Sequence, residues 1–229
     1  MPRADLALKR PLGQAWLVLC LLLFLLLPLF LPNTAQAQGY SPDVAEFDGS
    51  SSLGFAPSEA LYVAEAATIE FWVSPDWSSP LDYDPVVLSF SGEQGATYLV
   101  AVLRELDGLV LVSAGQRFFI PYQFEDSQMH HIAIVAQAGQ MVAYVDGQLR
   151  GGTEFTLQES PARGFWVGSA DGSTAPFVGA IAELRIWGVA LTQDEIVSYA
   201  GRDVASHPHK ARLRAQSLFV EDGMNIGRN

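Results

Sequence analysis

Strand-like segments recur along this chain from Val44 to Ile186, and turn signals separate them. Residues 68–73 and 141–145 alternate as half-buried strands do, whereas residues 98–103 and 109–112 are almost continuously apolar, as in strands buried on both faces. Asp-Gly pairs, in which both residues can take positive φ and close a tight hairpin, stand at 48–49, 107–108, 146–147 and 171–172. No helical period interrupts the series, so the pattern predicts an all-β fold of two packed antiparallel sheets.

One short helix is predicted after the last strand. Thr192 and Glu195 have the spacing of a capping box, in which each side chain accepts a hydrogen bond from the other residue's backbone N–H. Apolar residues follow at 196, 197 and 199, and Gly201 is placed to end the helix.

Residues 1–37 have the pattern of a secretory signal peptide. Arg3, Lys9 and Arg10 precede an uncharged apolar run at 15–27, and Ala35-Gln36-Ala37 is a small-x-small cleavage site. The mature chain would begin near Gln38 and would contain no cysteine, because Cys20 lies in the signal. The alternative is an uncleaved membrane anchor, since the apolar stretch to Leu31 reaches 17 residues, the low end of a bilayer span.

The charge balance excludes one class of partner. The chain has 13 Lys and Arg against 25 Asp and Glu, a net charge of −12, which argues against binding nucleic acid phosphates. Between Gln38 and Arg202 there are six Arg, no Lys and 21 acids. Such a surface suits a soluble exported protein and offers oxygen ligands to hard cations.

The character of the chain changes at Asp203. Residues 205–216 contain three bases, Lys210, Arg212 and Arg214, and no acid. We expect residues 203–229 to form a basic, flexible and solvated tail. An electrostatic contact of this tail with the acidic domain, a partner or a surface is the alternative, and metal chelation by His207 and His209 is a weaker one.

Five motifs then occur in a familiar order. They comprise 45–51 (AEFDGSS), 68–73 (TIEFWV), 130–135 (HHIAIV), 144–147 (YVDG) and 177–187 (FVGAIAELRIW) with the helix that follows. The series resembles the laminin-G-like jelly roll of the concanavalin A-like lectin/glucanase superfamily, especially its secreted, pentraxin-like branch, over Val44 to Ala200. The resemblance implies a jelly-roll sandwich for residues 38–202. Met129 stands where that family usually has Trp, and many members continue into a second module.

No catalytic constellation is visible. Glucanases of this superfamily place two Glu around an Asp on one strand face, whereas Glu70 has no acid at 68 or 72 and Glu183 is isolated. Asp194 and Glu195 are explained by the helix start. His130 and His131 should point to opposite faces of a strand, so they cannot readily hold one ion together. We therefore predict that the protein is not an enzyme.

The resemblance implies a calcium site at one edge of the sandwich. By position, its loops are residues 91–95 and 168–172, with Glu93, Gln94 and Asp171 as oxygen donors. Calcium takes six to eight oxygens, so carbonyls and water would have to complete the shell. The alternative is that these three are ordinary polar turn residues.

A second acidic loop, residues 76–84, suggests a sugar contact. Its candidate ligand-binding residues are Asp76, Trp77, Asp82, Tyr83 and Asp84. An aromatic ring can stack on a sugar face while carboxylates accept hydrogen bonds from hydroxyls. The alternative is that the aromatic residues are lids on the core.

These observations favour a secreted, periplasmic or extracellular recognition module that binds a glycan or a protein, with calcium as its candidate cofactor. After signal cleavage no membrane span would remain. A structural role in an envelope or matrix is the main alternative, and a glycan hydrolase or lyase is a further one. The sequence does not indicate the oligomeric state.

Overall fold

The computed structural model describes residues 44–56, 58, 66–92, 95–103, 108–113, 116–154, 164–217 and 224–226. The predicted signal peptide, Cys20 and the cleavage site lie outside these residues. Contacts divide the chain into Met1–Gly39 and Tyr40–Asn229, and every element below belongs to the second unit. In the described part of the chain, no helix is long and apolar enough to cross a membrane.

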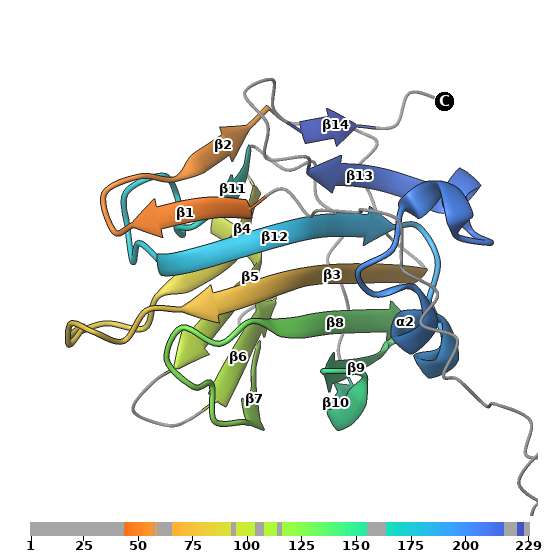
Figure 1. Ribbon diagram of the computed structural model, residues 1–229, viewed down its shortest axis with the longest axis horizontal. Helices are drawn as coiled ribbons and strands as arrows, with labels where there is room; N and C mark the ends of the chain where they lie inside the picture. The colour runs from red at the N-terminus through yellow and green to blue at the C-terminus, as the bar shows by residue number, and fades with distance from the viewer. Residues whose placement is uncertain are drawn as a thin grey trace, which may run out of the picture. The chain divides into compact units, whose positions relative to one another are not determined.

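Two antiparallel sheets form a sandwich, as predicted (Figure 1). The eight-stranded sheet has the order β10-β9-β8-β3-β12-β13-β14, with β1 also paired to β12. Its strands are β1 (Val44–Asp48), β3 (Ala66–Pro75), β8 (His130–Gln137), β9 (Gln140–Val145), β10 (Gln148–Glu154), β12 (Val178–Trp187), β13 (Leu213–Ser217) and β14 (Met224–Ile226).

The six-stranded sheet has the order β2-β11-β4-β5-β6-β7. Its strands are β2 (Leu53–Phe55), β4 (Val86–Gly92), β5 (Gly95–Leu103), β6 (Gly108–Ser113), β7 (Gln116–Pro121) and β11 (Gly164–Val167). The two near-continuous apolar runs of the sequence are β5 and β6. The all-β jelly-roll prediction is confirmed.

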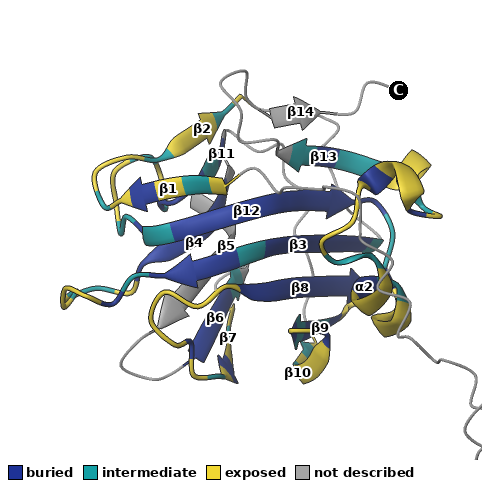
Figure 2. Cartoon of the chain, viewed as in Figure 1, coloured by how far each residue is buried: buried dark blue, intermediate teal, exposed yellow. Residues whose placement is uncertain are grey.

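The main core lies between the inner faces of the two sheets. It includes Phe71 and Ile181 from the eight-stranded sheet and Leu88, Leu109 and Phe165 from the six-stranded sheet, all fully buried. Burying each such side chain stabilises the fold by roughly 1.5–3 kcal/mol. β3, β8 and β12 are buried along most of their length, so the outer face of the eight-stranded sheet is covered too (Figure 2).

α2 (Gln193–Tyr199) forms part of that cover and has the predicted capping box. The Thr192 hydroxyl accepts a hydrogen bond from the Glu195 N–H at 3.3 Å, and Glu195 Oε2 accepts one from the Thr192 N–H at 2.8 Å. Ile196 is its buried residue, and it packs with Ala133, Val135 and Trp187. Gly201, with φ of +68°, follows the helix end, as predicted.

The Asp-Gly pairs behave differently from one another. Asp146 and Gly147 have φ of +52° and +71° and close the β9–β10 hairpin, as predicted. The pairs at 48–49 and 171–172 do not close hairpins, because the strands before and after each of them belong to different sheets. Residue 107 of the fourth pair lies outside the described residues.

Residues 203–217 form a C-terminal strap rather than the solvated tail that we expected. The strap comprises two 3-10 turns, Val204–Ser206 and Lys210–Arg212, and strand β13, which pairs with β12. His207 is 2% exposed, and Ala215 belongs to the main core. For these residues the prediction of a flexible tail is wrong, because their few apolar and aromatic side chains find partners on the outer sheet face and in the core.

Candidate functional site

The loop between β3 and β4 is anchored where it leaves β3. The Asp76 N–H donates to the Val178 carbonyl at 3.0 Å, and the Asp76 carboxylate accepts a hydrogen bond from the Ser78 N–H at 2.8 Å. Hydrogen bonds from Ser78 hold the pKa of Asp76 below its usual range. Asp76 therefore shapes the loop.

Trp77 is the second anchor of this loop. Its backbone N–H donates to Asp126 Oδ1 at 2.6 Å and its indole Nε1–H to the Phe124 carbonyl at 3.0 Å. The side chain is 8% exposed and belongs to the main core. Most of the Trp77 ring therefore lies on the core as a lid, which is one of the two interpretations that the sequence left open.

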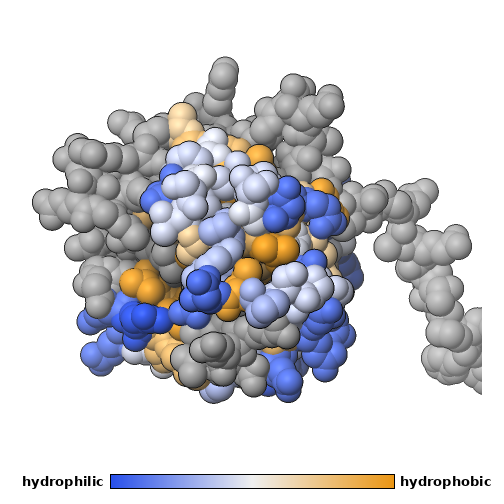
Figure 3. Space-filling view, turned by 90° about the vertical axis from the view of Figure 1, so that its left-hand side faces the viewer, coloured by the Kyte–Doolittle hydropathy of each residue, from blue (hydrophilic) through white to orange (hydrophobic). Residues whose placement is uncertain are grey.

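The anchored loop borders a hollow of about 680 Å³ that is open to solvent, which we call the loop hollow. Its lining residues are Trp77, Ser78, Pro80, Leu81, Asp82, Tyr83, Asp84 and Pro85. Four of the five predicted ligand-binding residues thus surround one space, and Asp76 is not among the lining residues. Asp82 and Asp84 are exposed and Tyr83 is half-buried. Figure 3 looks onto this end of the molecule, where apolar residues in orange lie beside hydrophilic residues in blue.

The hollow offers two kinds of contact. The carboxylates of Asp82 and Asp84 can accept hydrogen bonds from hydroxyl groups, while the Tyr83 ring and the Leu81 and proline side chains present apolar surface. The sequence pointed to the acids and aromatic residues of this loop. It gave no reason to include Leu81, Pro80 and Pro85, because their position on the wall depends on how Trp77 turns the loop.

A neighbouring loop carries Asp171. Asp171 Oδ1 accepts hydrogen bonds from the Ser173 N–H at 3.0 Å and the Thr174 N–H at 2.8 Å, and Oδ2 accepts one from the Thr174 hydroxyl at 2.8 Å. Hydrogen bonds from Thr174 and Ser173 hold its pKa below the usual range. In the loop after β1, Asp48 Oδ1 likewise accepts hydrogen bonds from the N–H groups of Ser50 and Ser51. Hydrogen bonds from these two serines lower the pKa of Asp48 to about 2. The Ser52 hydroxyl, donating to the Gly172 carbonyl at 3.1 Å, joins the two loops.

The described residues do not by themselves fit a calcium site. Of the three predicted ligands, Glu93 and Gln94 lie outside the described residues, and both carboxylate oxygens of Asp171 already accept hydrogen bonds. Throughout the described ranges, no three His, Cys, Asp or Glu side chains lie close enough to hold a metal. One engaged carboxylate falls short of the six to eight oxygens that calcium takes.

A buried charge network that sequence reasoning missed lies on the outer face of the eight-stranded sheet. Its members are Glu70, His131, Glu183, Arg185 and Trp187, all buried. Arg185 donates to Glu183 Oε2 at 3.0 Å and to Glu70 Oε1 at 3.5 Å, and Trp187 Nε1 donates to Glu70 Oε1 at 3.0 Å. His131 Nε2 lies 3.5 Å from Glu70 Oε2.

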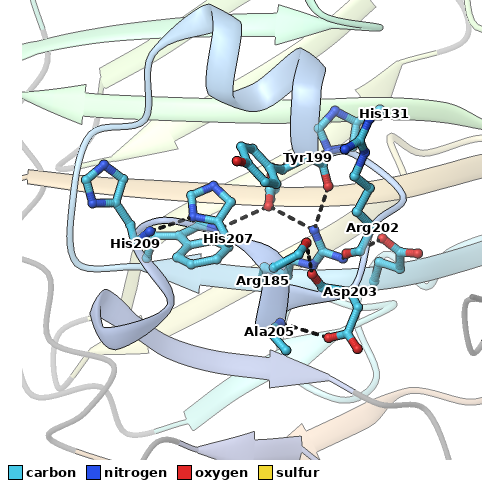
Figure 4. A network of polar contacts seen from close by, with 12 residues as sticks. His131, Arg185, Tyr199, Arg202, Asp203, Ala205, His207 and His209 are labelled. Atoms are coloured by element: carbon cyan, nitrogen blue, oxygen red, sulfur yellow. Dashed lines mark hydrogen bonds and ion pairs between the residues drawn. The ribbon is translucent and has the colours of Figure 1, made fainter.

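α2 and the strap seal this network. Arg185 also donates to the carbonyl of Tyr199, at the helix end, at 3.3 Å and to the carbonyl of Arg202 at 2.5 Å (Figure 4). Burial raises the pKa of Glu70, but the hydrogen bond and charge of His131, with Arg185 and Trp187, outweigh it and lower that pKa. Because its side chains are buried beneath these segments, the network is a scaffold feature and is not accessible to a substrate.

His130 and His131 take separate partners on opposite faces of β8, as predicted. His130 Nδ1 lies 2.8 Å from Asp146 Oδ2, beside the Tyr122 hydroxyl, which donates to the same oxygen at 3.0 Å. Burial and Asp146 raise the pKa of Tyr122 to about 12. Asp146 Oδ1 also accepts a hydrogen bond from the His131 N–H at 2.9 Å, so this aspartate fixes the turn and both histidines.

Comparisons with known proteins match this fold. A laminin G family model, described as concanavalin A-like lectin/glucanases superfamily, matches residues 47–197. The neuronal pentraxin receptor of Mus musculus is 28% identical over 129 residues, which are 47% of this chain and 26% of the receptor. The chain thus spans about a quarter of the length of that relative.

Two solved structures share the architecture at low sequence identity. The heptameric SAP-like pentraxin of Limulus polyphemus has a TM-score of 0.61 and 17% identity, covering 83% of this chain and 94% of the pentraxin. A putative carbohydrate binding protein of Bacteroides ovatus also has a TM-score of 0.61, with 18% identity, covering 81% of this chain and 54% of that one.

Proposed function

Because the chain belongs to the concanavalin A-like lectin/glucanase superfamily, we propose that it is a secreted recognition module that binds an extracellular glycan or protein without catalysing a reaction. The loop hollow carries the proposal. Its volume of about 680 Å³ lies in the range of small-molecule sites, and its walls combine exposed carboxylates with apolar and aromatic surface.

A glycan suits this hollow better than an apolar ligand does. Asp82 and Asp84 are exposed and can accept hydrogen bonds from neighbouring sugar hydroxyls, while the Tyr83 ring can pack against the apolar face of a sugar. The B. ovatus structure with the same fold is named as a putative carbohydrate binding protein, which supports this class of ligand.

The test is saccharide binding to the protein and to two variants. Asp82→Asn/Asp84→Asn keeps side-chain size but removes the charged acceptors, and we expect it to weaken binding about tenfold or more. Asp194→Asn is the matched control, because Asp194 is an exposed aspartate on α2, away from the hollow lining. Binding is measured on a glycan array and then by calorimetry.

The other outcomes decide between the alternatives. If no saccharide binds, the envelope or matrix assembly role replaces the recognition role. If the protein releases reducing sugar from a polysaccharide and Asp82→Asn/Asp84→Asn abolishes the release, it is a hydrolase. If both variants lose binding equally, the hollow is not the site.

Calcium assistance is part of the proposal as a separate prediction, supported by the family resemblance. Its predicted ligands are Glu93, Gln94 and Asp171. Calcium at about 100 times its Kd would stabilise the fold by about 2.7 kcal/mol and raise the melting temperature by a few degrees. We expect Asp171→Ala to remove that rise, and a metal-stripped protein that melts unchanged with added calcium contradicts the prediction.

A further inference from the structure

Lysine and arginine side chains are concentrated on the strap and on Arg202, which directly precedes it. Seven Lys and Arg are described, and one of them, Arg185, is buried in the charge network. The other six reach solvent wholly or in part, and four of these six lie within 13 residues. They are Arg202, Lys210, Arg212 and Arg214, whereas Arg117 and Arg150 lie on other strands.

Arg212 and Arg214 each place a guanidinium group against Gly188. Arg212 donates to the Gly188 carbonyl from Nε at 3.2 Å and from Nη2 at 2.6 Å. A Cβ atom on Gly188 would lie 2.6 Å from Arg214 Nε, so the absence of a side chain there admits the second guanidinium. The close contacts between basic and acidic side chains of described residues involve His130, His131, Arg185 and His209, and none involves Arg212 or Arg214.

Acidic loops gather at the opposite end of β12, away from the strap, and the acids beside the strap are Asp203, within it, and Glu195, which contacts His209. Asp48 pairs with Val178, and the Asp76 N–H donates to the Val178 carbonyl, so both lie where β12 begins. Gly188 follows the other end of this 10-residue strand (Figure 1), and a strand of that length spans about 30 Å. That distance exceeds the screening length of about 8 Å at physiological salt, so the loop acids do not neutralise the strap.

The strap exposes little apolar surface. The large hydrophobic residues that are exposed in the described ranges are Val44, Leu53, Phe119, Met129, Leu149 and Val197, and none belongs to residues 203–217. The strap therefore lacks the apolar centre of a protein interface, the wedge that inserts into a membrane, and the aromatic platforms on which nucleic acid bases stack. A hydrophilic polyanion matches a positively charged surface that exposes little apolar area.

We propose that Lys210, Arg212 and Arg214 form a binding surface for an acidic polysaccharide, distinct from the loop hollow. Carboxylate or sulfate groups along the polymer would accept charge-assisted hydrogen bonds from the two guanidinium groups, with Lys210 adding a third positive charge. Arg212 is pre-oriented by its contact with Gly188, so little side-chain freedom is lost on binding.

The test uses two polymers that differ in charge. Polygalacturonate carries a carboxylate on each sugar, and its methyl ester is the uncharged counterpart. We expect binding of polygalacturonate alone, weakening steeply as salt rises. Lys210→Gln/Arg212→Gln/Arg214→Gln should weaken it about tenfold or more, while Arg117→Gln/Arg150→Gln, which removes two exposed arginines elsewhere, should change it less than about twofold.

A second variant guards against loss of the strap itself. Lys210→Gln/Arg214→Gln leaves the contact between Arg212 and Gly188 in place, and we expect it to weaken binding without lowering the melting temperature. The proposal fails if polygalacturonate does not bind, if its ester binds equally well, or if both arginine variants lose binding alike. Tighter binding of single-stranded DNA or of anionic phospholipid vesicles at the same salt also overturns it. Asp82→Asn/Asp84→Asn should leave polygalacturonate binding intact, so this proposal and that for the loop hollow fail separately.

Discussion

Arg185 is 1% exposed, yet its guanidinium contacts the carboxylates of Glu70 and Glu183 and two backbone carbonyls. The two acids come from different strands, and Glu183 sits at the bulge of β12 with φ of +49°. In the sequence neither acid has another acid close to it on its own strand. Residue spacing also does not reveal which strands become neighbours in the sheet. The sequence therefore could not show that the two acids share one arginine.

Removing the arginine should leave two buried carboxylates without their counter-charge. We expect Arg185→Met to destabilise the protein by about 3–5 kcal/mol, as when one partner of a buried ion pair is removed. The measurement is urea unfolding at pH 7. Arg117→Met, at an exposed position, is the control and should change the free energy of unfolding by no more than about 0.5 kcal/mol. A similar loss in both variants would contradict the role that we give to Arg185.

His207 should make the strap sensitive to acid. Its ring packs against Trp187 and Tyr199, and burial holds its pKa below the usual 6.5, although Glu70 and Glu195 raise it and His209 and Arg185 lower it. The unfolded chain therefore binds a proton more readily than the folded chain. Stability is complete above pH 6.5 and falls as the pH drops below that value, by at most about 1.4 kcal/mol per pH unit.

His207→Phe keeps an aromatic ring there but has no proton to bind. Urea unfolding between pH 8 and pH 5 should show a shallower loss for this variant than for the native protein. Hydrogen exchange of the strap amides in the same range tests whether the loss is local. Parallel curves for the two proteins would show that other groups cause the acid sensitivity.

At the scale of elements, α2 is docked onto the β9–β10 turn. Gln193 Nε2 donates to the Gly147 carbonyl at 2.8 Å, and a Cβ atom on Gly147 would lie 2.6 Å from Val197 Cγ2. Gly147 thus serves two purposes, because the turn requires positive φ and the helix requires the missing side chain. The Asp-Gly signal predicted the turn with positive φ. The contact with the helix could not be predicted in this way, because α2 lies about 50 residues later in the chain.

A double-mutant cycle should separate these two purposes. Gly147→Ala should cost about 1 kcal/mol for the positive φ and a further 1–3 kcal/mol for the collision with Val197. Adding Val197→Ala should recover the collision part but not the first part. Thermal unfolding of the four proteins measures the coupling, and additive effects would show that the helix does not rest on this turn.

The whole molecule depends on the strap more than its composition suggests. The strap supplies Val204 and His207 to the outer cover and Ala215 to the main core. A chain ending at Arg202 should lose several kcal/mol of stability and expose Trp187, which tryptophan fluorescence would report as a red shift. A chain ending at Ser217 keeps the strap and should lose much less. If the shorter chain melts at the same temperature as the full-length protein, the strap does not contribute to the stability of the fold.

Local patterns predicted the sandwich, the capping box and the Asp146–Gly147 hairpin, because each rests on residues close together in the chain. They also brought Trp77, Asp82, Tyr83 and Asp84 to attention within one loop. The strap was predicted wrongly, since its basic residues suggested solvent while His207 and Ala215, each in a polar context, found buried places on other elements. The alternating pattern of residues 68–73 likewise gave no sign that Thr68 and Glu70 would be covered, with their partners on the segment after Ala182.

The position of strand β12 in the sheet also has a consequence for how the protein folds during its synthesis. It pairs with β3 so that Ala182 lies opposite Trp72, about 110 residues earlier, and β13 then joins its other edge. The eight-stranded sheet cannot be completed until β12 and β13, which ends at Ser217, have left the ribosome. Assembly from such distant partners is slow, in the range of milliseconds to seconds. The nascent polypeptide therefore cannot close this sheet during most of its synthesis, which is compatible with the secretion that we propose.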